Sequence, residues 1–201
     1  MTFYHGSSIA GIAEIGAKSE INEREKAPVV YLTPNRAYAL FYIRDLEVNF
    51  VTCGVTAAGY IRYDERFPDQ LRMLYKGKSG YLYKCGESTD FKTTSTRGVW
   101  VTKNPVLVEG VEYIPDVYEE ILKYEATGEV RVIRFETLTD GQKQDIFDML
   151  VNYIYKNDMI NQFTRKAEFY RNNFPDAWDY VVRHPDEKQT RIDEWNKRHR
   201  R

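Results

Sequence analysis

The chain has 201 residues, of which 42% are hydrophobic and 29% charged, and its formal net charge is −1. This composition is typical of a globular protein with one core and a small appendage. It excludes a protein that binds polyanions through its bulk charge, so contact with nucleic acid would need a local patch. Two cysteines form no zinc or disulfide pattern and fit a reducing compartment.

Membrane and targeting patterns are not recognisable in the sequence. No apolar run approaches the roughly 20 residues of a membrane span, and the first residues lack the basic-then-apolar order of a signal peptide. We therefore expect a cytoplasmic protein with no membrane contact and no metal site.

The order of the predicted elements is a β-rich body followed by helices. Strands are expected at 2–4, 28–32, 50–56, 60–63, 80–84, 98–101, 106–114 and 130–135. Helices are expected at 33–44, around 71–75, at 116–128, from 139 to about 154, and from 160 with a break near Pro175. This order predicts an α+β domain at 1–137 and a C-terminal helical extension at 138–201, whose charged tail from His184 is loosely held.

Capping residues set several of these helix limits. Thr33 and Pro34 form a good helix start, a hydroxyl at the cap followed by proline. Asp116 with Glu119, and Thr139 with Gln142, fit capping boxes. Gly128 is expected to end the second of these helices. Because Glu119 and Glu120 fall in a first helical turn, capping and the helix dipole explain them without a catalytic role.

Three separate segments carry residues suited to one chemistry. His5 and Gly6 follow a short strand, Tyr31 lies on a strand whose following helix carries Tyr42, and Glu112 lies on a later strand. Tyrosine rings can stack on a flat nicotinamide, and glycine lets its backbone approach a carboxamide closely. A carboxylate stabilises the oxocarbenium-like transition state in which a glycosidic bond breaks. These residues are those needed to bind and cleave a nicotinamide riboside.

The same segments resemble a known family. Tyr-His-Gly-Ser at residues 4–7 is followed by Val-Tyr-Leu-Thr-x6-Leu-Phe-Tyr at 30–42 and by Val-Glu-Tyr-Ile-x-Asp-Val at 111–117. This order resembles the ADP-ribosyltransferase superfamily, most closely its poly(ADP-ribose) polymerase-like branch with the His-Tyr-Glu triad. The resemblance covers roughly residues 3 to 137 and implies a split, mainly antiparallel sheet core with peripheral helices.

The resemblance also implies a role for each matching residue, with NAD as co-substrate. NAD would be bound by His5, Gly6, Ser7, Tyr31 and Tyr42. His5 would contact the adenosine-side ribose hydroxyl and Gly6 the carboxamide, while the two tyrosines, eleven residues apart as in the family, would sandwich the nicotinamide. Glu112 would be the catalytic carboxylate, acting with His5. A small hydroxyl residue of the family corresponds to Ala39 here, so one contact to the carboxamide would be missing.

The expected function is therefore that of an enzyme: NAD-dependent mono-ADP-ribosyl transfer to a macromolecular acceptor, either protein or nucleic acid, with release of nicotinamide. Transfer of single units is preferred because the segment between Tyr42 and Glu112 is short. The alternatives are an NAD glycohydrolase and a non-catalytic nucleotide- or protein-binding module on the same fold. A third is an RNA 2′-phosphotransferase, which relies on several arginines; Arg36, Arg44 and Arg62 cannot be placed in a pocket from the sequence.

Overall fold

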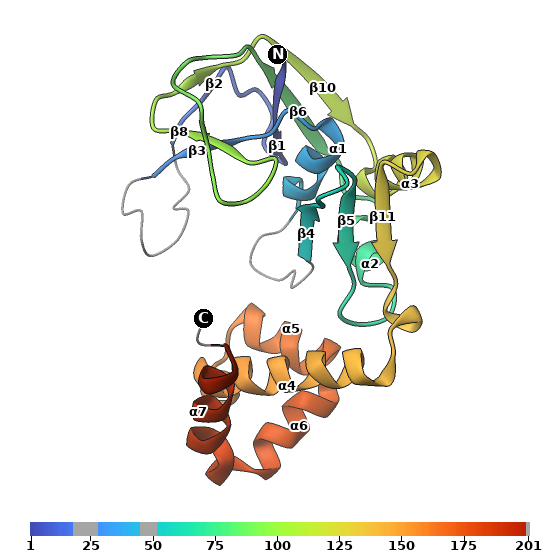
Figure 1. The fold of residues 1–201 in the computed structure, drawn as a ribbon, viewed down its shortest axis with the longest axis vertical. Helices are drawn as coiled ribbons and strands as arrows, with labels where there is room; N and C mark the ends of the chain where they lie inside the picture. The colour runs from blue at the N-terminus through green and yellow to red at the C-terminus, as the bar shows by residue number, and fades with distance from the viewer. Residues whose placement is uncertain (18–27, 45–51, 200–201) are drawn as a thin grey trace. The chain divides into compact units, whose positions relative to one another are not determined.

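The computed structural model of the chain describes residues 1–17, 28–44 and 52–199 (Figure 1). Contacts between residues divide it into two compact units. The first comprises Met1–Glu65 and Asp69–Ile133, and the second comprises Arg66–Pro68 and Arg134–Arg201. The sequence alone predicts one division, after residue 137, and does not indicate that residues 66–68 join the helical unit.

In the residues that the structure describes, the first unit contains all the strands, three short helical segments and one longer helix. Its strands are β1 (Phe3–Ser7), β2 (Glu14–Ile15), β3 (Val30–Leu32), β4 (Thr52–Val55), β5 (Ile61–Asp64), β6 (Gly80–Cys85), β7 (Lys92–Thr93), β8 (Trp100–Thr102), β9 (Val106–Leu107), β10 (Gly110–Ile114) and β11 (Val130–Ile133). Its helical segments are α1 (Arg36–Ala39), η1 (Leu40–Tyr42), α2 (Gln70–Tyr75) and α3 (Val117–Thr127). The α+β class predicted from the sequence is confirmed. The predicted residues Phe50 and Val51 lie outside the described residues.

The strands pair mainly in the antiparallel sense. One sheet has the order β1-β6-β10 and another β3-β8-β7, and both are antiparallel throughout. A single antiparallel bridge between Tyr4 and Thr33 joins β1 to the end of β3. The third sheet, β11-β5-β4, pairs β11 with β5 in parallel, and β2 pairs with β9 alone.

The register of the β1-β6-β10 sheet decides which side chains share a face. Gly6 pairs with Leu82, which pairs with Glu112. Leu82 is fully buried in the core that includes residues of α1 and α3. The next residue, Tyr83, is buried in a second core that includes Phe3. Because side chains alternate along a strand, this sheet separates two cores, and Glu112 lies on the face of Gly6 and α1.

Helix α1 begins later than the sequence predicts. The predicted start at Thr33-Pro34 is wrong, because Thr33 is extended and its backbone pairs with Tyr4. Asn35 caps the helix instead, and its side chain accepts a hydrogen bond from the backbone N–H of Tyr38 at 3.1 Å. The helix covers only Arg36–Ala39 before tightening into the 3-10 segment η1. Its buried face includes Ala37, Leu40 and Phe41, as predicted.

The segment around β10 and α3 confirms one prediction and corrects another. The single strand predicted at 106–114 is wrong, because β9 and β10 are separate strands that pair with β2 and β6. Asp116 caps α3, and its side chain accepts hydrogen bonds from the N–H groups of Tyr118 and Glu119. The Glu119 side chain pairs with Lys76, so only the Asp116 half of the predicted capping box is present. Gly128 ends the helix with φ 82°, a conformation that glycine adopts without strain.

The second unit is helical. It contains η2 (Phe135–Thr137), α4 (Asp140–Lys156), η3 (Met159–Asn161), α5 (Arg165–Asn173), α6 (Pro175–Arg183), η4 (Pro185–Glu187) and α7 (Lys188–His199), drawn in yellow to red in Figure 1. The capping box of Thr139 with Gln142 is confirmed. The expectation of a loosely held tail is wrong for residues 188–199, because α7 packs on α4 and Arg191 pairs with Asp148 at 3.2 Å. No described helix is long and apolar enough to cross a membrane.

Candidate functional site

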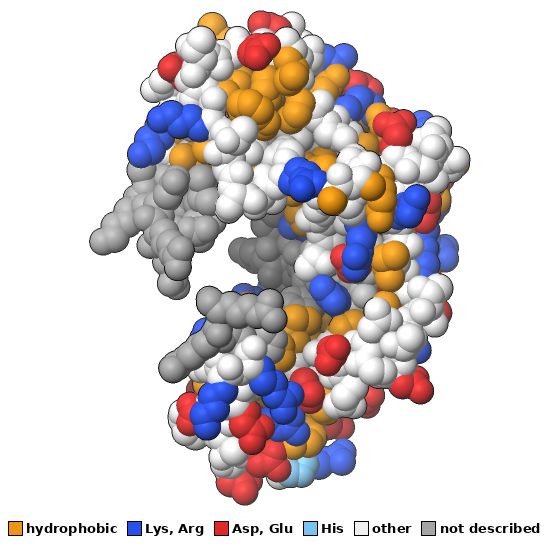
Figure 2. Space-filling view, in the orientation of Figure 1, with side chains coloured by type: hydrophobic (Ala, Val, Ile, Leu, Met, Phe, Trp, Pro, Cys, Tyr) orange, Lys and Arg blue, Asp and Glu red, His pale blue; other side chains and the backbone are white. Residues whose placement is uncertain are grey.

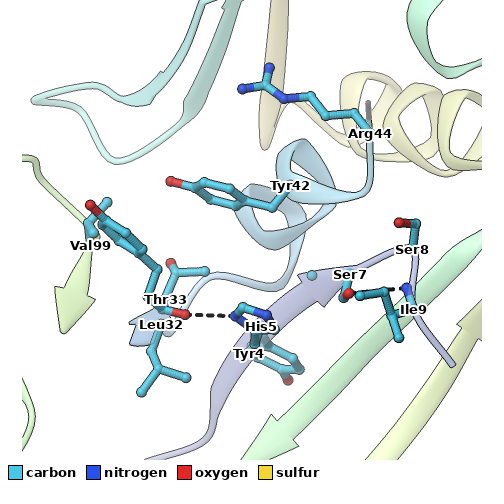
Figure 3. A pocket seen from close by; sticks show the side chains of 12 residues that line it. Tyr4, His5, Ser7, Ser8, Ile9, Leu32, Thr33, Tyr42, Arg44 and Val99 are labelled. Carbon is cyan, nitrogen blue, oxygen red and sulfur yellow. Dashed lines mark hydrogen bonds between the residues drawn. The ribbon is translucent and has the colours of Figure 1, made fainter. Parts of the chain in front are cut away.

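A cavity of about 610 Å³ lies at the end of β1. Its lining includes His5, Gly6 and Ser7 of β1, Tyr31 of β3, Tyr42 of η1 and the following Arg44. Figure 3 shows side chains of β1, of the η1 segment and of the end of β3 around this space. A volume of this size is typical of pockets for small ligands and cofactors. All five residues predicted to bind NAD therefore line one cavity.

His5 is anchored at the floor of this cavity. Its Nδ1 lies 2.9 Å from the backbone carbonyl oxygen of Tyr31, as the dashed line in Figure 3 marks. Because a carbonyl oxygen only accepts, Nδ1 carries the proton of the neutral ring, and Nε2 keeps a lone pair. Burial lowers the pKa of His5 below its ordinary value of 6.5, although the bond to Tyr31 opposes this shift. At neutral pH the ring is an uncharged hydrogen-bond acceptor through Nε2.

The lowered pKa of His5 gives a testable pH dependence. The unfolded chain takes up the His5 proton at higher pH than the folded chain, so the free energy of unfolding should fall as the pH drops below 6.5. NMR titration of the imidazoles should place the His5 midpoint below 6.5. A His5→Gln variant should lose this part of the pH dependence in urea unfolding. A midpoint at or above 6.5 would contradict the buried, neutral ring.

Gly6 serves two purposes in the strand. A Cβ at this position would lie 2.0 Å from the backbone oxygen of Ala39, so glycine lets α1 lie directly on β1. The backbone of Gly6 also has a defined direction. Tyr4 donates its N–H to the Thr33 carbonyl at 2.8 Å and accepts from the Thr33 N–H at 3.1 Å. Backbone groups two residues apart in a strand point to the same edge, so those of Gly6 point to the edge on which Tyr4 meets Thr33.

In the part of the chain that the structure describes, Tyr4 makes the backbone hydrogen bonds on that edge of β1, both of them with Thr33. The carbonyl of Tyr31 accepts from the His5 ring instead of continuing the ladder. The N–H and C=O of Gly6 consequently point past the end of the bridge, on the side of the cavity that Gly6 lines. One donor and one acceptor side by side form the complement of a carboxamide.

The tyrosine rings supply flat apolar surface. Tyr42 is half-buried, and its ring packs edge-on against Phe41 at 5.2 Å and against Tyr38 at 5.8 Å between centroids. Burial raises the pKa of Tyr42 above its ordinary value of 10, so the phenol is protonated at neutral pH. Tyr31 is half-buried and packs against the same core. Rings that are held by neighbours lose little freedom when a planar ligand stacks on them.

Glu112 is placed differently from the other predicted site residues. It is not among the residues that line the cavity, and it is two strand spacings, roughly 10 Å, from Gly6 across the sheet. Its Oε1 pairs with Nη2 of Arg36, and its Oε2 accepts from Nε of Arg36 at 3.2 Å. Lys84 Nζ lies 3.8 Å away. The hydrogen bond from Arg36 lowers the pKa of Glu112 below its ordinary value of 4.5.

The contact between Arg36 and Glu112 belongs to a network that joins three elements. Nη1 of Arg36 donates to Glu120 of α3 at 2.9 Å and contacts the Tyr124 hydroxyl. Glu120 also pairs with Lys123 at 2.8 Å. Glu119 instead pairs with Lys76. The network ties α1 to β10 and α3, which is a structural role for Glu112 that spacing in the sequence does not reveal.

The three arginines that sequence could not place have different environments. Arg36 is paired with two carboxylates, and Arg62 pairs with Asp64 at 2.6 Å. Arg44 lines the cavity. Nothing in the sequence around Arg44 distinguishes it from the other two, because its position depends on how η1 packs against the sheets.

Comparison of the chain with protein-family models, with curated proteins and with solved structures gave no match.

Proposed function

We propose that the chain is an NAD-dependent ADP-ribosyltransferase with the split-sheet fold of that superfamily, and that it transfers a single ADP-ribosyl unit to a macromolecular acceptor. One observation carries the proposal. His5, the backbone of Gly6 and the rings of Tyr31 and Tyr42 line one cavity, although they come from segments far apart in the chain. A histidine acceptor, a carboxamide complement and two flat rings together match the parts of a nicotinamide riboside.

In this proposal each group has a distinct task. The nicotinamide lies against Tyr31 and Tyr42, and its carboxamide bonds to the N–H and C=O of Gly6. A ribose hydroxyl of NAD donates to Nε2 of His5. The bond between C1′ of the ribose and the nicotinamide nitrogen breaks, and its electrons leave with neutral nicotinamide. An acceptor nucleophile then attacks C1′ and loses a proton, which completes the transfer.

Glu112 is assigned the electrostatic task. A carboxylate near the ribose stabilises the positive charge that develops as nicotinamide leaves. Arg36 holds the pKa of Glu112 low, so the carboxylate stays ionised at neutral pH. With both oxygens bonded to Arg36, Glu112 is oriented but a poor proton acceptor, which fits charge stabilisation better than general-base catalysis.

The direct test uses NAD labelled in the adenylate part. Nicotinamide release and label transfer to candidate protein and RNA acceptors should both be observed with the full chain. Release without transfer would identify an NAD glycohydrolase, in which water is the acceptor. NAD binding without any release would contradict the enzyme assignment.

A second candidate is a non-catalytic module that binds a nucleotide. The specific observation in its favour is Glu112, which lies outside the cavity lining and is engaged by Arg36. This candidate retains the roles of His5, Gly6 and the two tyrosines and removes only the bond cleavage. Binding measurements with NAD, combined with the release assay, distinguish the two.

The stacking role of Tyr42 can be tested with a matched pair of variants. Tyr42→Ala removes the ring, and we expect it to weaken NAD binding about 2- to 13-fold, since a stacked aromatic pair contributes about 0.5–1.5 kcal/mol. Tyr42→Phe keeps the ring and should bind within about twofold of wild type. Isothermal titration with NAD measures both. Equal binding by Tyr42→Ala and wild type would exclude a ring-stacking role.

A further inference from the structure

Arg44 is the charged side chain of the cavity lining that has no carboxylate partner among the residues the structure describes. Its Nε and Nη1 are buried and have no hydrogen-bond partner in that part of the chain. Its guanidinium lies 3.5 Å from the centroid of the Phe41 ring, which shields one face. The Tyr75 hydroxyl contacts it as a neutral partner and also donates to the Phe41 carbonyl at 3.0 Å.

Buried charged donors without partners are unusual. Removing an ionised group from water is costly unless hydrogen bonds compensate, and a guanidinium stays protonated inside proteins. Arg36 follows this rule, since it is partly buried and pairs with the carboxylates of Glu112 and Glu120. Arg44 departs from it at the edge of an open cavity. A ligand that brings negative charge to the part of Arg44 that lines the cavity would neutralise the guanidinium.

We infer that Arg44 binds a phosphate group of the cavity ligand, and that this phosphate belongs to the diphosphate of a nucleotide. Phosphate oxygens match the planar donor arrangement of a guanidinium. The tyrosine rings of the same cavity suit a ligand that also carries flat rings. This inference deepens the proposed function, because NAD carries such a diphosphate, but binding at Arg44 needs no chemical step.

A nucleotide is favoured over an RNA end by the charge distribution. On the face shown in Figure 2, Lys and Arg side chains are interspersed with Asp and Glu, and the whole chain has a formal net charge of −1. Proteins that bind an RNA backbone usually carry a stripe of Lys and Arg side chains along the path of the RNA. A small ligand needs only the local charge of Arg44.

The inference is tested by comparing ADP with adenosine, which differ only in the diphosphate. Isothermal titration of the full chain should show that ADP binds more tightly than adenosine. Arg44→Gln should weaken ADP binding about 10- to 100-fold and leave adenosine binding nearly unchanged. Arg44→Lys should retain part of the preference, because lysine keeps the charge but loses the planar donors. Arg62→Gln, whose arginine pairs with Asp64, is the matched control.

Several results would overturn the inference. ADP and adenosine binding equally well to wild type would do so, as would an unchanged ADP affinity in Arg44→Gln. If Arg44→Gln does not fold, the inference is tested instead by the ADP affinity of Arg44→Lys and by the salt dependence of ADP binding to wild type. An oligoribonucleotide with a 2′-phosphate that binds better than ADP, and better than its 2′-hydroxyl form, would overturn the nucleotide assignment in favour of an RNA end.

The outcomes separate this inference from the proposed function. Arg44-dependent ADP binding without nicotinamide release from NAD would leave the phosphate site intact and refute the transferase. If Arg44→Gln releases nicotinamide from NAD as fast as wild type, the phosphate site at Arg44 is refuted and NAD cleavage is supported.

Discussion

Replacing Gly6 with alanine should strongly destabilise the first unit. The new Cβ would lie 2.0 Å from the Ala39 backbone oxygen and 3.3 Å from Ile43. The first atom belongs to backbone held by a capped helix, so it cannot move aside as a flexible side chain does. Overpacking of this kind costs about 1–3 kcal/mol or more, because α1 must shift away from β1.

Gly110→Ala is the matched control for this experiment. Gly110 lies in β10 of the same sheet, and an added Cβ would be 3.7 Å from Lys84 Cδ, an ordinary contact. We expect its urea midpoint to stay near that of wild type, while Gly6→Ala unfolds at clearly lower urea. Gly6→Ala should also lose NAD binding, since a shift of α1 displaces η1 and Tyr42. Equal midpoints for the two variants would mean that α1 is not packed against Gly6.

The parts of the fold that were predictable depend on local chemistry. The Thr139 capping box and the glycine end of α3 need only residues within one turn, and both are confirmed. The predicted start of α1 was wrong because it depends on a contact outside the local sequence. Thr33-Pro34 has good local helix-start chemistry, but pairing of Thr33 with Tyr4 keeps it extended and moves the cap to Asn35. A contact distant in the sequence overrides local propensity there.

The candidate site was predictable in its residues and less so in its geometry. The segments of His5, Tyr31 and Tyr42 were identified from their order, and the structure brings them to one cavity. Gly6 was expected for its close approach to a ligand, whereas the space of its missing side chain is filled by Ala39. Strand register places Glu112 beside Arg36. Arg44 is distinguished by being buried without a carboxylate partner among the described residues, and this property arises only when the chain folds.

The assignment of Glu112 gives the sharpest functional prediction. Glu112→Gln keeps the size of the side chain and removes its charge, so the developing positive charge on the ribose loses its anionic partner. We expect the rate of nicotinamide release from NAD to fall about 10²- to 10³-fold, the range found when one electrostatic group is removed from a transition state. NAD affinity should change little, because His5, Gly6 and Tyr42 remain. Initial rates at saturating NAD and titration of NAD binding measure the two effects separately.

Glu120→Gln separates the catalytic role of Glu112 from its structural one. Glu120 shares the same partner, Arg36, at 2.9 Å, but comes from α3. Each variant removes one of the two carboxylates that Arg36 contacts, so each perturbs the α1, β10 and α3 network. If Glu112 acts on the substrate, Glu120→Gln should keep its rate within about threefold of wild type. A similar loss of rate in both variants would mean that Glu112 acts only through the network. An unchanged rate in Glu112→Gln would mean that this carboxylate takes no part in the chemistry of the cavity.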